Sequence, residues 1–159
     1  MNKLLPIFIL FLLSFGFAAQ SEGQTLSKSQ TELIKNQVDS IFRKMLVFAE
    51  KLEFNELSSR VDDTNRAGFI SNGKYYADYQ SLIDDVKQNA QGISQQDISI
   101  KEKNITVLSD KIVLLTASGV AVARINDGRE ISANILWSFV YEKIDNNWKV
   151  IYSHQSTTR

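Results

Sequence analysis

The chain has one side chain whose ordinary pKa lies near neutrality. His154 is the only histidine, and there is no cysteine. In a cavity, an imidazole can act as a general base or as a hydrogen-bond donor. The alternative is a structural histidine whose nitrogens are bonded within the fold. Tyr152 stands two residues earlier, so both side chains point to the same face of a strand.

The preceding segment, 129–143, carries large apolar side chains at alternate positions. A tight turn at Asp145-Asn146 is expected to join it to the last strand. The resulting register sets Glu142 opposite Lys149, which is an opposite-charge pair. The same register predicts three facing pairs on the inner face: Tyr141 with Val150, Phe139 with Tyr152, and Trp137 with His154.

A two-residue turn at Asp127-Gly128 extends this register to the strand before. It predicts Ser118 beside Trp137 and Thr116 beside Phe139. An aromatic and aliphatic face with few polar groups is typical of a pocket for a small molecule. The candidate ligand-binding residues are Thr116, Ser118, Trp137 and Tyr152, and the candidate catalytic residue is His154. The alternative is that these aromatic side chains only pack beneath a helix.

Acidic side chains are scarce at this predicted pocket, since no predicted inner-face position is Asp or Glu. Asp62 and Asp63, in the loop after the predicted second helix, are the only acids expected to have a route to the pocket mouth, so Asp63 is a further candidate ligand-binding residue. The alternative for both is turn chemistry. One histidine and no cysteine leave only hard carboxylate ligands, so no metal site is expected. No phosphate-binding loop or dinucleotide motif is present, and no cofactor is expected.

The elements that must position these residues begin with a helix. Ser29 and Glu32 have the spacing of a capping box, and apolar residues then recur at three- and four-residue steps as far as Leu52. This pattern predicts a long amphipathic helix that ends near Glu53. A short second helix is expected over Phe54 to Val61.

Strands follow from turn chemistry and alternation. Asn72-Gly73 predicts a small hairpin, and Asp78 is expected to cap a further helix. From Ile98 onward the apolar period becomes two. Four strands are expected in sequential antiparallel order, at 97–108, 111–125, 129–143 and 148–157. The chain is therefore predicted to be an α+β domain.

The outer face of the predicted sheet is flat and largely apolar. Helices cannot cover both faces in a domain this small, so we expect a homodimer through this face. An ordinary solvated face is the alternative. The residues expected there are Val113, Leu115, Ala117, Gly119, Ala121, Ala123, Leu136, Val140 and Ile151.

The N-terminus resembles a secretory signal. Lys3 precedes an apolar run from Leu4 to Phe17, and Ala18 and Ala19 offer a cleavage site. We expect a signal peptide over 1–19, a disordered leader over 20–28, one domain over 29–159, and an exported protein. A retained anchor is the alternative, although the run is short for a membrane span. Balanced charges predict no nucleic-acid partner and, after cleavage, no membrane partner.

The end of the chain resembles nuclear transport factor 2-like domains. The matching residues are Tyr141 to Val150, followed by His154-Gln155-Ser156; Tyr152 stands where the family pattern has a first histidine. The resemblance points to the branch with SnoaL-like proteins and the association domain of calcium/calmodulin-dependent kinase. It implies a cystatin-like cone, in which a long helix and shorter helices pack in the concave face of a strongly bent antiparallel sheet.

Two functional hypotheses follow. The first is an exported binding or assembly domain whose apolar cone pocket takes an unknown hydrophobic small molecule. The second is a small-molecule isomerase, cyclase or dehydratase of the SnoaL or ketosteroid-isomerase type that uses His154. An acid within hydrogen-bonding reach of that histidine would favour the enzyme, and a cone without a cavity would favour assembly.

Overall fold

The computed structural model of the chain describes residues 26–158. The residues of the predicted signal peptide, and positions 20–25 of the predicted leader, lie outside this range. Within it, no helix is long and apolar enough to cross a membrane. The elements are α1 (Lys28–Glu50), α2 (Phe54–Ser58), β1 (Phe69–Ser71), β2 (Lys74–Tyr76), α3 (Tyr79–Asn89), β3 (Ile93–Val107), β4 (Ile112–Ile125), β5 (Glu130–Ile144) and β6 (Asn147–Thr158).

Helix α1 begins slightly earlier than the sequence pattern predicted. Its capping box is made by Ser27 and Gln30: the Gln30 amide lies 3.2 Å from the Ser27 hydroxyl, and the Ser27 amide lies 2.9 Å from the Gln30 side-chain oxygen. The same spacing occurs two residues later at Ser29 and Glu32, and that later box was the wrong choice. Leu26 packs against the core just before the cap, which favours the earlier start.

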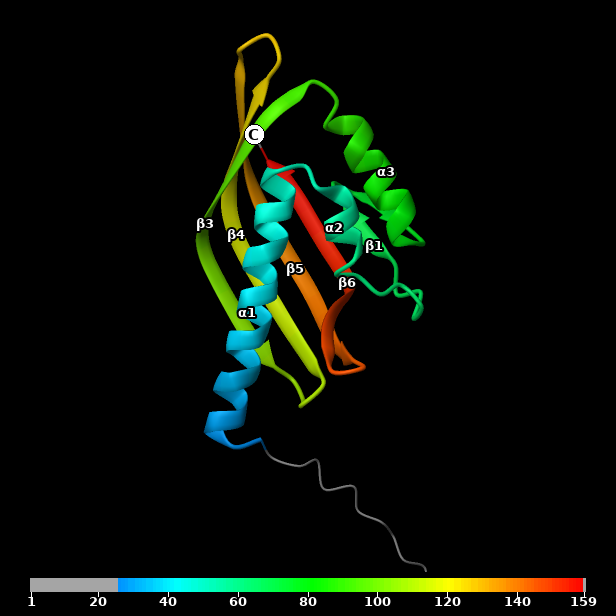
Figure 1. Cartoon of the computed structure of the whole chain (residues 1–159), viewed down its shortest axis with the longest axis vertical. Coiled ribbons are helices and arrows are strands. Elements are labelled where there is room, and N and C mark those ends of the chain that lie inside the picture. Colours follow the sequence, from blue (N-terminus) through cyan, green and yellow to red (C-terminus); the bar gives the residue numbers. More distant parts are fainter. Residues whose placement is uncertain (1–25, 159) are drawn as a thin grey trace, which may run out of the picture.

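The strands form one six-stranded sheet in the order β2-β1-β6-β5-β4-β3. Strands β3 to β6 make the predicted antiparallel meander, and the predicted Asn72-Gly73 hairpin supplies β1 and β2. Strand β1 pairs in parallel with β6, which extends the sheet beyond the meander. Figure 1 shows the strands curving around α1, with α2 and α3 on the same side. The predicted α+β fold, with helices on the concave face of a bent sheet, is confirmed.

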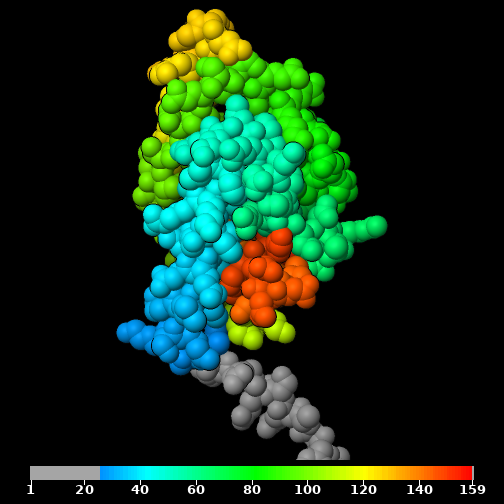
Figure 2. All heavy atoms as spheres, viewed as in Figure 1, coloured from blue at the N-terminus to red at the C-terminus, as the bar shows by residue number. Residues whose placement is uncertain are grey.

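The core lies between α1 and the inner face of the sheet. Val38, Phe42 and Met45 of α1 are buried against the sheet. The Phe42 ring lies 6.0 Å from the Phe139 ring and 6.3 Å from the Trp137 ring, measured between centroids. Burying one such side chain contributes about 1.5–3 kcal/mol. In Figure 2 the three helices and their connections hide most of this face, while the tip of the β4–β5 hairpin projects past them.

The predicted register of β5 and β6 holds near their turn and fails beyond it. Asp145 and Asn146 form a two-residue turn with positive φ angles, and Tyr141 pairs with Val150 as predicted. A β-bulge then inserts Ile151, so the next pair is Val140 with Tyr152. An extra residue moves every later side chain to the opposite face.

Tyr152 and His154 therefore lie on the outer face. Ser153 and Gln155 take the predicted inner places beside Phe139 and Trp137. His154 is exposed and pairs with Ser138 in the ladder. The prediction that Trp137, Tyr152 and His154 share the inner face is wrong.

The predicted register of β4 and β5 is also displaced by one residue. The Ile125 amide bonds to the Arg129 carbonyl at 2.8 Å, so the loop has three residues rather than two. Gly128 has a φ of 88° at its last position, as three-residue hairpin loops require. Ala117 consequently pairs with Trp137, and Leu115 with Phe139.

This displacement exchanges the two faces of β4. Thr116 and Ser118 lie on the outer face, so their predicted inner placement is wrong. Residues predicted to be outer are inner instead: Val113 and Leu115 are fully buried in the core, and Ala121 is only 9% exposed. Leu136 and Val140 are on the outer face as predicted, and Leu114, Val120 and Tyr152 lie there as well.

Candidate functional site

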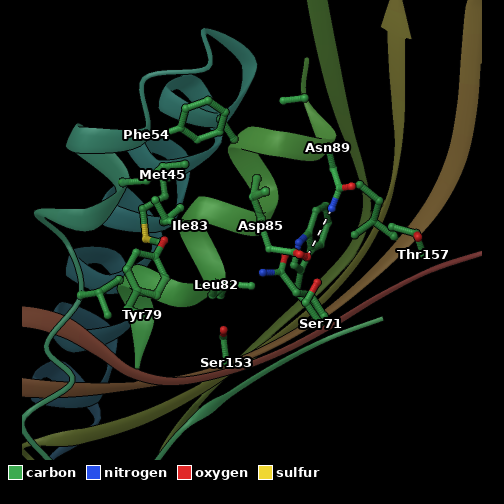
Figure 3. A pocket seen from close by; sticks show the side chains of 18 of the residues that line it. Met45, Phe54, Ser71, Tyr79, Leu82, Ile83, Asp85, Asn89, Ser153 and Thr157 are labelled. Atoms are coloured by element: carbon green, nitrogen blue, oxygen red, sulfur yellow. Dashed lines mark hydrogen bonds between the residues drawn. The ribbon is translucent and has the colours of Figure 1, made fainter. Parts of the chain in front are cut away.

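A cavity of about 480 Å³ opens between α1, α3, the β1–β2 hairpin and the inner face of the sheet. Its apolar walls include Met45 from α1, Leu82 and Ile83 from α3, and Trp137 from β5. Figure 3 shows α3 side chains facing the sheet across this space, and Ser153 pointing into it from β6. The volume and the mainly apolar lining are those of a small-molecule site.

Local contacts hold α3 over the cavity. Asp78 caps the helix by accepting the Ser81 amide at 2.7 Å, as the sequence predicted. Asp63 accepts the Tyr79 amide at 3.1 Å and so ties the preceding loop to the start of α3. Asn72 in the hairpin turn accepts the Thr157 amide at 2.8 Å. These contacts satisfy backbone donors at the helix start and on β6.

A polar cluster lies at one end of the cavity. The Asp85 carboxylate accepts hydrogen bonds from the Tyr76 hydroxyl at 2.6 Å, the Lys74 ammonium at 2.9 Å and the Asn89 amide at 3.3 Å. The Tyr76 and Lys74 hydrogen bonds lower the pKa of Asp85. Asp85 is therefore ionised at neutral pH, and it is the only acid among the described residues that line the cavity.

Two hydroxyl groups lie away from this cluster. The Ser153 hydroxyl is buried and has no hydrogen-bond partner within residues 26–158. Tyr79 lines the same cavity beside Met45 (Figure 3). Burial raises the pKa of the Tyr79 phenol above its usual value, so the group stays protonated. The two residues are linked through Phe69, which pairs with Ser153 and packs edge-on against the Tyr79 ring at 5.2 Å.

The predicted site residues are not brought together. Trp137 lines the cavity, as expected for the inner face. Thr116 and Ser118 line a second, more open hollow of about 470 Å³ with Leu136 and Ser138. Tyr152 and His154 are on the outer face, and none of these four residues lines the cavity. The role predicted for His154 has no geometric support there.

Asp63 also lies outside the lining. Its bond to the Tyr79 amide is backbone capping, and the neighbouring Asp62 accepts from the Thr64 amide at 3.1 Å in ordinary turn chemistry. These contacts favour a structural role in the turn for both acids, which was the alternative to ligand binding.

Several polar residues of the cavity were missed from the sequence: Lys74, Tyr76, Tyr79, Asp85 and Ser153. Asp85 could have been found, because it stands three residues after Leu82 and therefore shares the apolar face of a predicted helix. Ser153 could not, because its face depends on the bulge. Among the described residues, no three His, Cys, Asp or Glu side chains gather in a way that could hold a metal ion.

Comparison with known protein families and curated proteins gives no match. Solved structures do match. A nuclear transport factor 2-like superfamily protein from Salmonella enterica aligns over 80% of this chain and 93% of its own, with a TM-score of 0.70 and 14% identity. A candidate scytalone dehydratase from Novosphingobium aromaticivorans aligns over 82% and 89%, with a TM-score of 0.72 and 11% identity.

A third match is a candidate calcium/calmodulin-dependent protein kinase II association domain from Xanthomonas campestris. It aligns over 76% of this chain and 85% of its own, with a TM-score of 0.66 and 14% identity. Identities this low establish the architecture, whereas activity depends on the particular side chains of a site. The chain has the fold of the nuclear transport factor 2-like proteins, the fold that its C-terminal hairpin resembled in sequence.

Proposed function

We propose that the protein binds a small, mainly apolar molecule in the cavity between α1, α3 and the sheet. The observation that carries this proposal is the cavity itself, about 480 Å³ with largely apolar walls. A protein interior normally leaves few voids larger than a water molecule. A space of this size, with a few polar groups at defined places, is typical of a ligand site. Export of the protein is part of the proposal and rests on the apolar N-terminal run.

The test blocks the cavity with a large side chain. Val86 on α3 lines the cavity, whereas Val47 on α1 is exposed and does not. We expect the uncharged fluorescent probe N-phenyl-1-naphthylamine to bind the wild type and Val47→Trp, and to lose most of its binding to Val86→Trp. Thermal melts by circular dichroism check that both variants fold. Equal probe binding by folded Val86→Trp would show that this cavity is not the site.

The second candidate function is acid–base catalysis in the same cavity. Asp85 is the observation that favours it, because an ionised carboxylate beside a phenol and an ammonium group is a plausible proton acceptor. One match with the same fold is a candidate dehydratase. In this chain, Asp85 accepts three hydrogen bonds, which make its carboxylate a weak base in the free protein. If a substrate is found, loss of its turnover in Asp85→Asn with retained probe binding would favour the enzyme. Unchanged turnover of that substrate would exclude Asp85 as the catalytic base.

The predicted homodimer remains a prediction. The outer face holds exposed Leu136 and half-buried Leu114, Val120 and Val140. Leu136 and Val140 were expected there and the other two were not. The polar pair Thr116 and Ser138 separates Leu136 from the Leu114–Val140 pair. The assembly role and the binding role are compatible, since the cavity opens on the opposite face of the sheet.

A further inference from the structure

The cavity has two chemically different polar regions. One is the Lys74–Asp85–Tyr76 cluster, whose charges and hydroxyl are already paired with one another. The other holds two hydroxyl groups. The Ser153 hydroxyl is buried and has no hydrogen-bond partner among residues 26–158, whereas Tyr79 is a half-buried residue of the lining whose hydroxyl faces no charged group of the cluster. Groups that satisfy one another need no ligand, whereas buried groups without partners carry a cost that a ligand can remove.

We propose that the cavity selects uncharged molecules that carry a carbonyl oxygen, and that the Ser153 and Tyr79 hydroxyls donate hydrogen bonds to this oxygen. The inference rests on the proposed ligand-binding function and adds a class of ligand to it. The carbonyl would lie on the side of the cavity away from Asp85, and the apolar body would lie against Leu82, Ile83 and Trp137.

Ser153 is the stronger half of the argument. Its side chain is 2% exposed, and its neighbours in the sheet are the aromatic residues Phe139 and Phe69. Serine is an uncommon choice at a fully apolar position, because an unbonded buried hydroxyl costs about 1–3 kcal/mol. Figure 3 shows the side chain pointing from the sheet into the cavity. The hydroxyl is thus held where a bound molecule would meet it.

Tyr79 supplies the second donor. Its backbone amide is bonded to Asp63, but its hydroxyl makes no hydrogen bond within the described chain. Burial keeps the phenol protonated, so it presents an O–H group and not a negative charge. Two neutral hydroxyls can donate to one acceptor oxygen, since a carbonyl has two lone pairs.

The same surroundings disfavour a charged ligand group at this place. Lys74, the only Lys or Arg of the described cavity lining, is bonded to Asp85 in the other polar region. A carboxylate beside Ser153 and Tyr79 would be buried without a cation, which is costly. A neutral carbonyl pays a much smaller desolvation cost.

The experiment compares two probes that share a ring system: 2-acetylnaphthalene, which has a carbonyl, and 2-ethylnaphthalene, which does not. Their dissociation constants are measured by titration of tryptophan fluorescence, because Trp137 lines the cavity. The variants are Ser153→Ala and Tyr79→Phe. The matched controls are Ser138→Ala on the outer face and Tyr75→Phe on the exposed side of the hairpin.

We expect each cavity variant to weaken the ketone by about two- to tenfold, the range of one neutral hydrogen bond, and to leave the hydrocarbon unchanged. The controls should change neither. Melting temperature should not fall in Ser153→Ala, because no protein hydrogen bond is lost.

Equal effects on both probes, or no effect in either variant, would overturn the inference and leave the proposed function standing. Weaker ketone binding in only one of the two variants would show that Ser153 and Tyr79 do not both donate to the carbonyl oxygen. If the wild type bound neither naphthalene but still bound N-phenyl-1-naphthylamine, the carbonyl preference would be wrong. If it bound none of the three probes, the proposed function would fail as well.

Discussion

The inner face of the sheet has two ends that use similar side chains for different purposes. Near the Asp145-Asn146 turn, Val113, Tyr141 and Trp148 are buried in the core, and none of them lines the cavity. We call this the filled end. Toward the β1–β2 hairpin, Trp137 and Ser153 face the cavity instead. We call this the cavity end.

The difference comes from what lies above each end. Helix α1 packs directly on the filled end, where the Trp148 indole also donates to Gln37 at 3.0 Å. Helix α3 covers the cavity end, and its first turn is held by hydrogen bonds from the Tyr79 and Ser81 amides to Asp63 and Asp78. Aromatic side chains on one strand can thus serve packing at one end and a ligand site at the other.

The largest expected effect is at the filled end. Trp148→Ala should lower the free energy of unfolding by about 3–5 kcal/mol, because it leaves a large void in the core. Trp137→Ala should cost less, because Trp137 already borders empty space. Urea unfolding measures both. A smaller loss for Trp148 than for Trp137 would break the comparison between the two ends.

A second effect concerns the close approach of β3 and β4 at the inner face. A Cβ atom on Gly119 would lie 2.5 Å from the Ser99 carbonyl oxygen and 3.2 Å from the Trp137 ring. Gly119→Ala should therefore destabilise the protein by about 1–3 kcal/mol. The neighbouring Ser118→Ala on the outer face is the control, with a change within about 0.5 kcal/mol. A Gly119→Ala variant as stable as wild type in chemical denaturation would contradict this packing.

The polar cluster at the cavity end predicts that the stability of the protein falls at low pH. The pKa of Asp85 is lowered in the folded state by Tyr76 and Lys74. Its contribution to stability is thus complete above the ordinary pKa of about 3.9 and is lost as the pH falls through the lowered value. Thermal melts between pH 2 and about 6 should show a smaller acid-induced loss in Asp85→Asn than in wild type. Asp84→Asn, on the exposed side of the same helix, should behave as wild type.

The smallest effect on stability is expected on the outer face. Leu136 is 54% exposed, so Leu136→Asp should change stability by no more than about 0.5 kcal/mol. If the predicted homodimer forms there, sedimentation should find a dimer for the wild type and a monomer for this variant. Leu108→Asp, an exposed leucine beside the β3–β4 turn, should remain a dimer. A wild type that is monomeric at high concentration would remove the homodimer prediction.

The order of elements was predictable from local chemistry. Asp78 at a helix start, Asn72-Gly73 in a hairpin and the alternation after Ile98 each act over a few residues, and the structure has the element that each one predicts. The face of β5 was also predictable, since Trp137 and Tyr141 are both inner. The candidate site was predictable only in part, because Trp137 alone of its predicted residues lines the cavity.

Sequence by itself determined which segments are helices and strands, because caps, turns and periodicity are local. Tertiary structure decided which polar side chains face the cavity. One inserted residue at Ile151 sent His154 outward and Ser153 inward, and one extra loop residue before Arg129 exchanged Ser118 for Ala117. Side chains alternate with a period of two, so a single-residue shift reverses a whole strand. Gly128 at the end of the β4–β5 loop is compatible with three loop residues, but Ile151 stands inside a regular strand, so only the pairing with β5 reveals the bulge.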